Sequence, residues 1–277
     1  MSPETIAECF AVMNNAYAAW SFDYFLDSME RLGLNRIDLW GGVQHFDAFA
    51  INARSIDAFR RRLEARGMRV IAYTPELLAY PFNFASPEAC VRRASVNYAK
   101  RNIGICAALE CEIMLLSPGW GLQDIPLNQS RQWSDDCLFT LAEHARENGI
   151  RLALEHLTPQ SSNLLTHCRA VIDTLRRVDH PALGAVLDLG QMSLFGEQVA
   201  DYAGPLGNKL FHVHIMDGTP ASHLAFGDGV LPLESYHRTL LNAGYTGHFT
   251  LEINDGRYAA HPHEALTQCV TRLCEWS

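Results

Sequence analysis

The sequence lacks the features that mark several large protein classes. Lysine occurs only twice in 277 residues, as Lys100 and Lys209, and the formal net charge is −9. Proteins that bind nucleic acids need clustered Lys and Arg to neutralise phosphates, so we expect no nucleic-acid partner. No uninterrupted apolar run reaches the roughly 18 residues that a membrane-spanning helix needs, so we expect no membrane partner either.

Paired cysteines are also missing. The eight cysteines are scattered along the chain without a single CxxC pair, and most have apolar neighbours. This distribution favours reduced thiols over a disulfide framework and therefore a reducing compartment. The segment Met1–Ala7 is polar and acidic and lacks the apolar stretch of a secretory signal. The sequence thus predicts a cytoplasmic protein.

What the sequence does contain is a repeated unit of a short apolar run, a loop and an amphipathic segment. Eight runs have the composition of buried strands: Cys9–Asn14, Arg36–Trp40, Arg69–Tyr73, Glu112–Ser117, Arg151–Glu155, Gly184–Asp188, Leu210–His214 and Phe249–Ile253. Strands that alternate with helices form parallel sheets. Eight units in one chain of this length predict a single α/β domain over residues 1–277, a closed (β/α)₈ TIM barrel. An open doubly wound sheet is the alternative, but no GxGxxG motif follows the first run.

Helices are expected between these runs. The clearest helical periodicity occurs in Ser55–Arg66, Ala89–Ala108, Trp133–Asn148, Cys168–Val178 and Leu233–Asn242. Four glycines follow predicted helices and precede the next strand: Gly33, Gly67, Gly149 and Gly244. A glycine at this position commonly takes the left-handed conformation that ends a helix, so we expect it at all four.

The candidate site comes from the last four predicted strands. Each closes on a possible metal ligand, and these four are Glu155, Asp188, His214 and Glu252. Taken singly, a carboxylate there can cap a helix or pair with an arginine, and a histidine can be an ordinary core residue. A TIM barrel, however, brings its strand ends to one opening. Three buried carboxylates at one place require a compensating cation.

The ligand types indicate which cation. Three carboxylates and one imidazole form an oxygen-rich set that suits Mn²⁺ best, with Co²⁺, Mg²⁺, Ni²⁺ or Zn²⁺ as alternatives. A site with open positions can bind substrate oxygens and polarise a carbonyl group. Side chains two residues apart on a strand point the same way, so His212 is expected one layer deeper in the barrel than His214.

Together with the motifs around them, these residues resemble the xylose-isomerase-like barrel superfamily of sugar epimerases and isomerases. The likeness is greatest to the fructoselysine 3-epimerases and more distant to the D-tagatose 3-epimerases. It runs over nearly the whole chain and includes Leu39-Trp40-Gly41-Gly42, Tyr73-Thr74-Pro75-Glu76 with Tyr80, Glu155-His156-Leu157-Thr158-Pro159, His212-Val213-His214-Ile215 with Asp217, and Gly227-Asp228-Gly229. The strand-end ligands are shared by the whole superfamily, whereas the segments around Trp40 and Tyr73 are more specific.

The resemblance implies a divalent-metal-dependent isomerase that acts on a ketose or ketosamine, such as a fructoselysine-like or tagatose-like sugar. Glu155 and Glu252 resemble a pair that binds metal and also moves protons, and they would invert C3 through an enediolate. Asp188 and His214 resemble the other two ligands. The expected partner is a small sugar, and a homo-oligomer is left open. His45, Glu76 and His223 are the candidates for substrate contacts, although each fits an ordinary loop or capping role as well.

Some positions depart from the family pattern and leave the substrate open. Gln191 stands where the tagatose-type enzymes carry a histidine, Pro220 where they carry an arginine, and Gln160-Ser161 where several relatives carry a carboxylate. An aldose–ketose isomerase and a keto-inositol-type dehydratase would use the same metal site and are the alternatives. A non-catalytic sugar-binding barrel is less consistent with the sequence, because both proton-transfer carboxylates are present.

Overall fold

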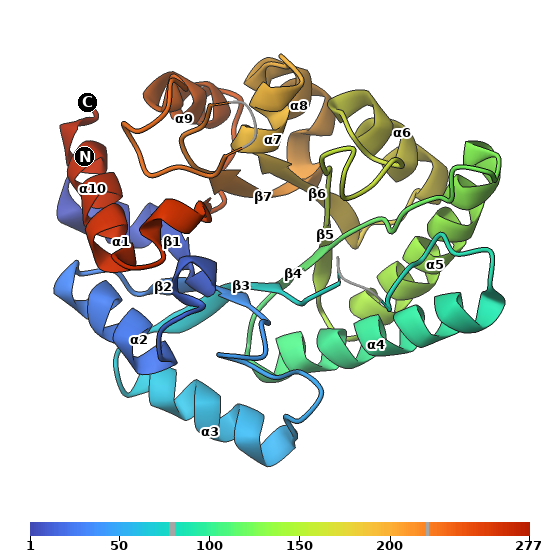
Figure 1. Cartoon of the computed structure of the whole chain (residues 1–277), viewed down its shortest axis with the longest axis horizontal. Coiled ribbons are helices and arrows are strands. Elements are labelled where there is room, and N and C mark those ends of the chain that lie inside the picture. The colour runs from blue at the N-terminus through green and yellow to red at the C-terminus, as the bar shows by residue number, and fades with distance from the viewer. Residues whose placement is uncertain (78–80, 220–221) are drawn as a thin grey trace.

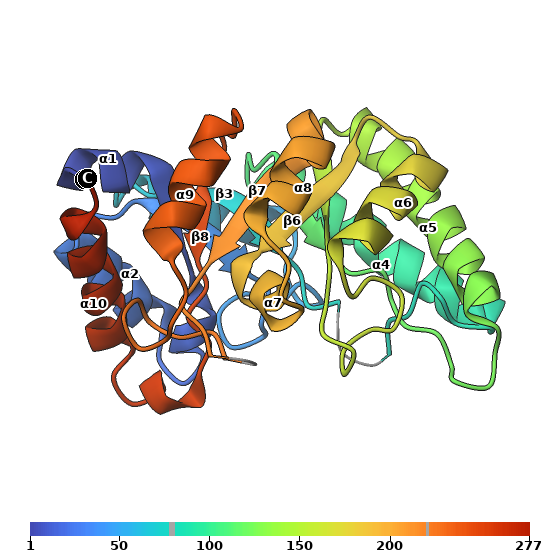
Figure 2. The ribbon, with the colours of Figure 1, turned by 90° about the horizontal axis from the view of Figure 1, so that it is seen from above.

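The computed structural model describes residues 1–77, 81–219 and 222–277; Tyr80 and Pro220 lie outside the described residues. Eight parallel strands form a closed barrel in chain order, with β8 paired to β1. Figure 1 shows the strands surrounded by helices, and Figure 2 shows the same barrel turned by 90°. The predicted (β/α)₈ barrel is therefore confirmed.

All eight predicted strands are present; β2 and β5 have the predicted ends, and the ends of the others differ from the prediction by at most two residues. They are β1 (Phe10–Met13), β2 (Arg36–Trp40), β3 (Arg69–Thr74), β4 (Ile113–Leu116), β5 (Arg151–Glu155), β6 (Leu183–Asp188), β7 (Leu210–Ile215) and β8 (Phe249–Leu251). The strands are almost entirely buried, because helices cover the outside of the barrel and side chains fill the inside. This double burial explains why each strand is a continuous apolar run in the sequence.

The helices follow the predicted order. They are α1 (Pro3–Cys9), α2 (Phe22–Arg31), α3 (Ala53–Glu64), α4 (Ala89–Ala108), α5 (Leu127–Glu147), α6 (Cys168–Val178), α7 (Leu189–Leu194), α8 (Val199–Leu206), α9 (Leu233–Asn242) and α10 (Pro262–Glu275). The start of α5 was predicted six residues too late, at Trp133, because its polar first turns carry little apolar periodicity. Gly33, Gly67, Gly149 and Gly244 all have the expected positive φ, between 67° and 88°.

Two register shifts influence what points into the barrel. Ile37 pairs with Val70 but Asp38 pairs with Ala72, so Ile71 is an extra residue of β3. In the same way, Ala185 pairs with Leu210 but Val186 pairs with His212, so Phe211 is an extra residue of β7. Bulges of this kind re-aim neighbouring side chains. Both lie directly beside polar residues of the barrel interior, namely Asp38 and His212.

A separate, smaller apolar cluster lies among the strands β3 to β7. It is made of Ala72, Ile113, Leu115, Ala153, Val186 and Phe211, with Ile71 packed against it. Two of its members lie in register with polar residues, since Ala72 pairs with Asp38 and Val186 pairs with His212. The larger apolar core lies between the strands and the surrounding helices.

Within the described residues, no helix combines the length and the apolarity that a membrane crossing requires. The cysteines are free thiols, and most of them are buried. The cytoplasmic location stays a prediction.

Candidate active site and metal centre

A cavity of about 280 Å³ opens at the carboxyl ends of the strands. Three of the four predicted ligands line it, Glu155, His214 and Glu252, together with side chains from the first four strands and their loops. A larger hollow of about 560 Å³ lies outside the barrel, beside Asp217 and Arg272, but none of the predicted ligands lines it. The positions of the predicted ligands therefore identify the smaller cavity as the candidate site.

The structure brings all four predicted ligands together. Each of Glu155, Asp188, His214 and Glu252 offers one atom, and these atoms all lie within 4.8 Å of one another. His214 Nδ1 is 2.8 Å from Glu252 Oε2 and 3.5 Å from Glu155 Oε1. Glu252 follows the last residue of β8 and is still held to the barrel, because its N–H donates to the carbonyl of Ile215. Four adjacent strands thus deliver one side chain each to a single point.

Asp188 has two roles, one for each oxygen. Its Oδ1 accepts a hydrogen bond of 2.7 Å from the N–H of Gln191 and caps α7. Its Oδ2 lies 3.2 Å from His223 Nε2. Burial alone would raise the pKa of Asp188, but the neighbouring charge and hydrogen bond of His223 outweigh burial and lower it to about 2. Asp188 therefore caps a helix with one oxygen, and its other oxygen lies beside His223.

The pKa values of Glu155 and His214 show how strongly the charged groups of the site interact. Burial and, to a smaller extent, the negative charges of Glu252 and Asp188 raise the pKa of Glu155 to about 7, although His214 opposes the shift. Burial would lower the pKa of His214, but the negative charge of Glu252 and the hydrogen bond to the carboxylate of Asp38 raise it well above its usual value. The metal-free protein thus holds protons at positions that a cation would replace.

Two buried donor atoms test whether a metal fits. His214 Nδ1 and Glu252 Oε2 approach each other without hydrogen-bond geometry, and neither has a hydrogen-bond partner in the part of the chain that the structure describes. Unpaired buried polar atoms are rare because they cost free energy. One nitrogen and several carboxylate oxygens around one point form a donor set for a divalent ion. The residues present therefore fit the predicted cation.

The three predicted substrate contacts differ in position. Glu76 lines the cavity, and its Oε2 accepts a hydrogen bond of 3.3 Å from Trp40 Nε1. His223 stands at the edge of the metal centre, with Nε2 3.2 Å from Asp188 and 3.7 Å from Glu252. His45 is not part of the cavity lining; its two ring nitrogens contact Asn14 Nδ2 and the carbonyl of Trp20, each at 2.9 Å. All three contacts stay predictions, and for His45 the geometry favours a structural bond between loops.

Sequence reasoning missed several residues that the structure places at the site. Asn15 lines the cavity, and its Nδ2 donates to Glu252 Oε1 at 3.4 Å. Asn254 also lines the cavity, two residues after Glu252. Asn15 follows the end of β1 by two residues and Asn254 follows the end of β8 by three, and this position near strand ends was a signal for both. Asp38 lies deeper, and a carboxylate inside an apolar strand was the overlooked signal.

Comparison with known proteins agrees with this geometry. Residues 26–272 match the family model described as xylose isomerase-like TIM barrel. The chain belongs to this family. The fructoselysine 3-epimerase of Shigella flexneri is 32% identical over 231 residues, which cover 83% of each chain. Epimerases are isomerases, so the predicted enzyme class is confirmed.

Solved structures of other proteins share the same barrel fold. A D-psicose 3-epimerase crystallised in the presence of D-fructose superposes with a TM-score of 0.81 and 16% identity, over 96% of this chain and 97% of its own. The IolI protein, crystallised with a zinc atom, superposes with a TM-score of 0.80 and 17% identity, over 96% of this chain and 97% of its own. At these identities the likeness establishes the fold.

Proposed function

We propose that this chain is a divalent-metal-dependent epimerase that inverts C3 of a ketose or ketosamine. The observation that carries the proposal is the convergence of Glu155, Asp188, His214 and Glu252 within 4.8 Å at the cavity of the barrel. A divalent ion held by these residues, Mn²⁺ by preference, would polarise the ketone and stabilise negative charge on its oxygen. The similarity to a fructoselysine 3-epimerase supports the substrate class.

The two glutamates would move the protons. Epimerisation removes a proton from the carbon beside the ketone on one face and returns a proton on the other face, so it needs a base and an acid on opposite sides. Glu155 and Glu252 come from β5 and β8, which are not adjacent in the barrel, so their carboxylates approach the cavity from different directions.

The remaining cavity residues would hold the sugar. Glu76 and Asn254 offer oxygen and nitrogen atoms for sugar hydroxyls, and Trp40 forms a flat wall. Asn15 supports Glu252 through the 3.4 Å hydrogen bond. His223 would add a donor at the edge of the metal centre.

The test is solvent deuterium incorporation, followed by NMR, with the Mn²⁺-loaded protein and a panel of ketoses, fructose-amines and ketose phosphates. A 3-epimerase exchanges the hydrogen on C3 and forms the C3 epimer. Exchange at C1 with formation of an aldose would instead identify an isomerase, and loss of a hydroxyl group would identify a dehydratase. Absence of exchange across the whole panel in a protein shown to hold metal would contradict the proposal.

A further inference from the structure

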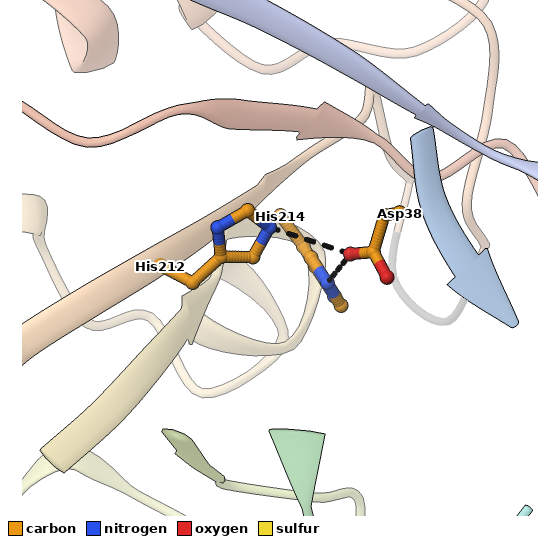
Figure 3. A group of neighbouring side chains, drawn as sticks. All are labelled: Asp38, His212 and His214. Atoms are coloured by element: carbon orange, nitrogen blue, oxygen red, sulfur yellow. Dashed lines mark hydrogen bonds and ion pairs between the residues drawn. The ribbon is translucent and has the colours of Figure 1, made fainter. Parts of the chain in front are cut away.

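A second polar layer lies below the four candidate ligands, inside the barrel. It consists of Asp38 on β2, His212 on β7 and Thr250 on β8, all with no exposed surface. Figure 3 shows Asp38 pointing from its strand toward the two histidines of β7. A buried carboxylate needs compensation by donors, and here the donors come from strands far apart in the sequence.

Both carboxylate oxygens of Asp38 have hydrogen-bond partners. Its Oδ1 accepts from the hydroxyl of Thr74 at 2.8 Å. Its Oδ2 accepts from the hydroxyl of Thr250 at 3.1 Å and lies 3.1 Å from His214 Nε2. His212 Nε2 is 3.3 Å from the same oxygen and 2.7 Å from the hydroxyl of Thr250. Although burial would raise the pKa of Asp38, the hydrogen bonds from the two histidines hold it below the usual range.

These contacts determine how His214 is protonated when it acts as a ligand. Both oxygens of Asp38 accept hydrogen bonds from hydroxyl groups, those of Thr74 and Thr250, so in the contact with Asp38 Oδ2 His214 donates from Nε2. Neutral imidazole carries one N–H, and the lone pair then lies on the other ring nitrogen. That nitrogen, Nδ1, is the atom that faces Glu252 and Glu155. The contact with Asp38 therefore selects the tautomer that presents a lone pair to the metal centre.

Asp38, His212 and His214 are also spaced closely enough to hold an ion of their own. His214 belongs to both groups, however, and binding two ions would require its ring to lose both N–H protons. The oxygens of Asp38 are already engaged by the hydroxyls of Thr74 and Thr250. The geometry thus favours a hydrogen-bonded layer below one metal centre over a second metal centre.

We propose that Asp38 is a positioning residue that fixes the tautomer and ring orientation of His214, so that Nδ1 is presented as a metal ligand. This inference rests on the metal centre of the proposed function. Carboxylates that accept the free N–H of a ligating histidine orient the ring and strengthen it as a ligand, and their loss commonly weakens metal binding about 10- to 100-fold. Asp38 and His214 are 176 residues apart, and the barrel alone brings them together.

The test compares Mn²⁺ affinity and stoichiometry in the wild-type protein, Asp38→Asn and Asp38→Leu, by titration calorimetry. Leucine removes the acceptor, and we expect binding to weaken about 10- to 100-fold with one ion still bound per chain. Asparagine keeps one oxygen that His214 can donate to but loses the charge, so its loss should be smaller. This graded rescue is not expected of a residue that merely fills space.

Two further variants keep the test decisive. Glu143 Oε1 contacts His180 Nε2 at 2.6 Å, outside the barrel. Glu143→Gln changes this carboxylate–histidine contact and should leave Mn²⁺ affinity unchanged. Thr250→Val preserves the shape and removes one donor to Asp38, so it should weaken binding severalfold. If the Asp38 variants fail to fold, this variant decides, and an unchanged affinity would overturn the inference.

The outcomes separate this inference from the proposed function. A wild-type protein that binds no Mn²⁺ would overturn both. A wild-type protein that binds one ion, with unchanged affinity in both Asp38 variants, would overturn only the role of Asp38. Two ions in the wild-type protein and one in Asp38→Asn would show that Asp38 is itself a ligand.

Discussion

The two halves of the barrel are built alike but present different side chains to the same cavity. In the second half, β5 to β8 lead into Glu155, Asp188, His214 and Glu252. In the first half, the cavity is lined at the ends of β1 to β4 by Met13, Trp40, Thr74 and Leu116. All strands of a parallel barrel end at the same opening, so the two halves can carry different side chains on the same backbone architecture. Charge and proton transfer can be concentrated in one half while the other shapes the substrate pocket.

Asp38 is one of the residues that connect the two halves by hydrogen bonds. It comes from the first half, on β2, and contacts His214 of the second half. Variants in the second half should accordingly affect turnover and metal binding, and variants of the first half's cavity wall should affect substrate affinity. Each of the following predictions tests that division.

The largest effect is expected for Glu252→Gln. Glutamine keeps the shape of the side chain but cannot accept a proton, so kcat should fall by about 10² to 10⁴-fold, the usual contribution of a general base. KM should change much less. Metal content must be measured in the same sample, because Glu252 is also a proposed ligand. Near-normal turnover in a metal-loaded variant would show that Glu252 does not transfer the proton.

The two glutamates should differ in which epimer they serve. With Glu155→Gln, exchange of the substrate hydrogen for solvent deuterium should persist for one C3 epimer and fail for the other. Glu252→Gln should show the opposite preference, because each carboxylate faces one side of the substrate. The measurement is NMR-detected exchange for each pure epimer. Equal loss for both epimers in both metal-loaded variants would favour a single-base isomerase.

Metal removal should destabilise the protein measurably. An ion at about 100 times its dissociation constant stabilises the folded state by about 2.7 kcal/mol. For a chain of this size, that corresponds to a rise in Tm of about 5 to 10 °C. Calorimetric scans with Mn²⁺ and with a chelator would measure the difference. Asp188→Asn should reduce this difference in Tm. A Tm that does not depend on the ion would contradict the proposal that the second half of the barrel holds a metal.

Metal affinity should increase with pH. Burial raises the pKa of Glu155 to about 7 in the metal-free protein, so below pH 7 binding must release this proton. Between pH 6 and 7, release of this proton should raise the affinity about fivefold, because about half of the Glu155 carboxyl groups are already ionised at pH 7. The stability of the metal-free protein should change in the opposite direction. Because the folded-state pKa exceeds the ordinary value of 4.5, the contribution of Glu155 to stability is lost as pH rises from 4.5 through 7.

These opposite trends can be checked by calorimetry in buffers of different ionisation enthalpy and by thermal scans of the chelated protein. Glu64→Gln is a suitable control, because Glu64 is exposed and pairs only with Arg60 among the described residues. An affinity that is flat between pH 6 and 7 would mean that Glu155 is already ionised before the metal binds.

The sequence predicted the second half of the site better than the first for a physical reason. Each ligand of the second half ends an apolar run, so both its type and its place stand out. Asp38 gives no such signal, because its partner His214 is brought near only by closure of the barrel and by bulges at Ile71 and Phe211. Local patterns therefore predicted the strands and their ends, whereas contacts between distant strands required the structure.

Helix prediction shows the same limit. The short α7 begins directly after its N-cap Asp188, and α8 contains Pro205, so neither has the extended apolar periodicity of α6. Their place is set by capping and by packing on the barrel. Asp188 illustrates the point, because one oxygen caps α7 while the other faces the metal centre.

The smallest effect is expected in the first half, at Glu76. Its carboxylate accepts a hydrogen bond from Trp40 and lines the cavity, without contacting any of the four ligands among the described residues. Glu76→Gln should raise KM by about 3- to 10-fold and leave kcat within about twofold, because a contact made equally in the ground and transition states affects binding alone. Steady-state kinetics on the substrate found by the exchange panel would measure both constants. Glu110→Gln is the matched control, since Glu110 is exposed, precedes β4 at the opposite end of the barrel and pairs with Arg60. A fall in kcat comparable to that of Glu252→Gln would show that the first half takes part in proton transfer, and the division between the halves would then be wrong.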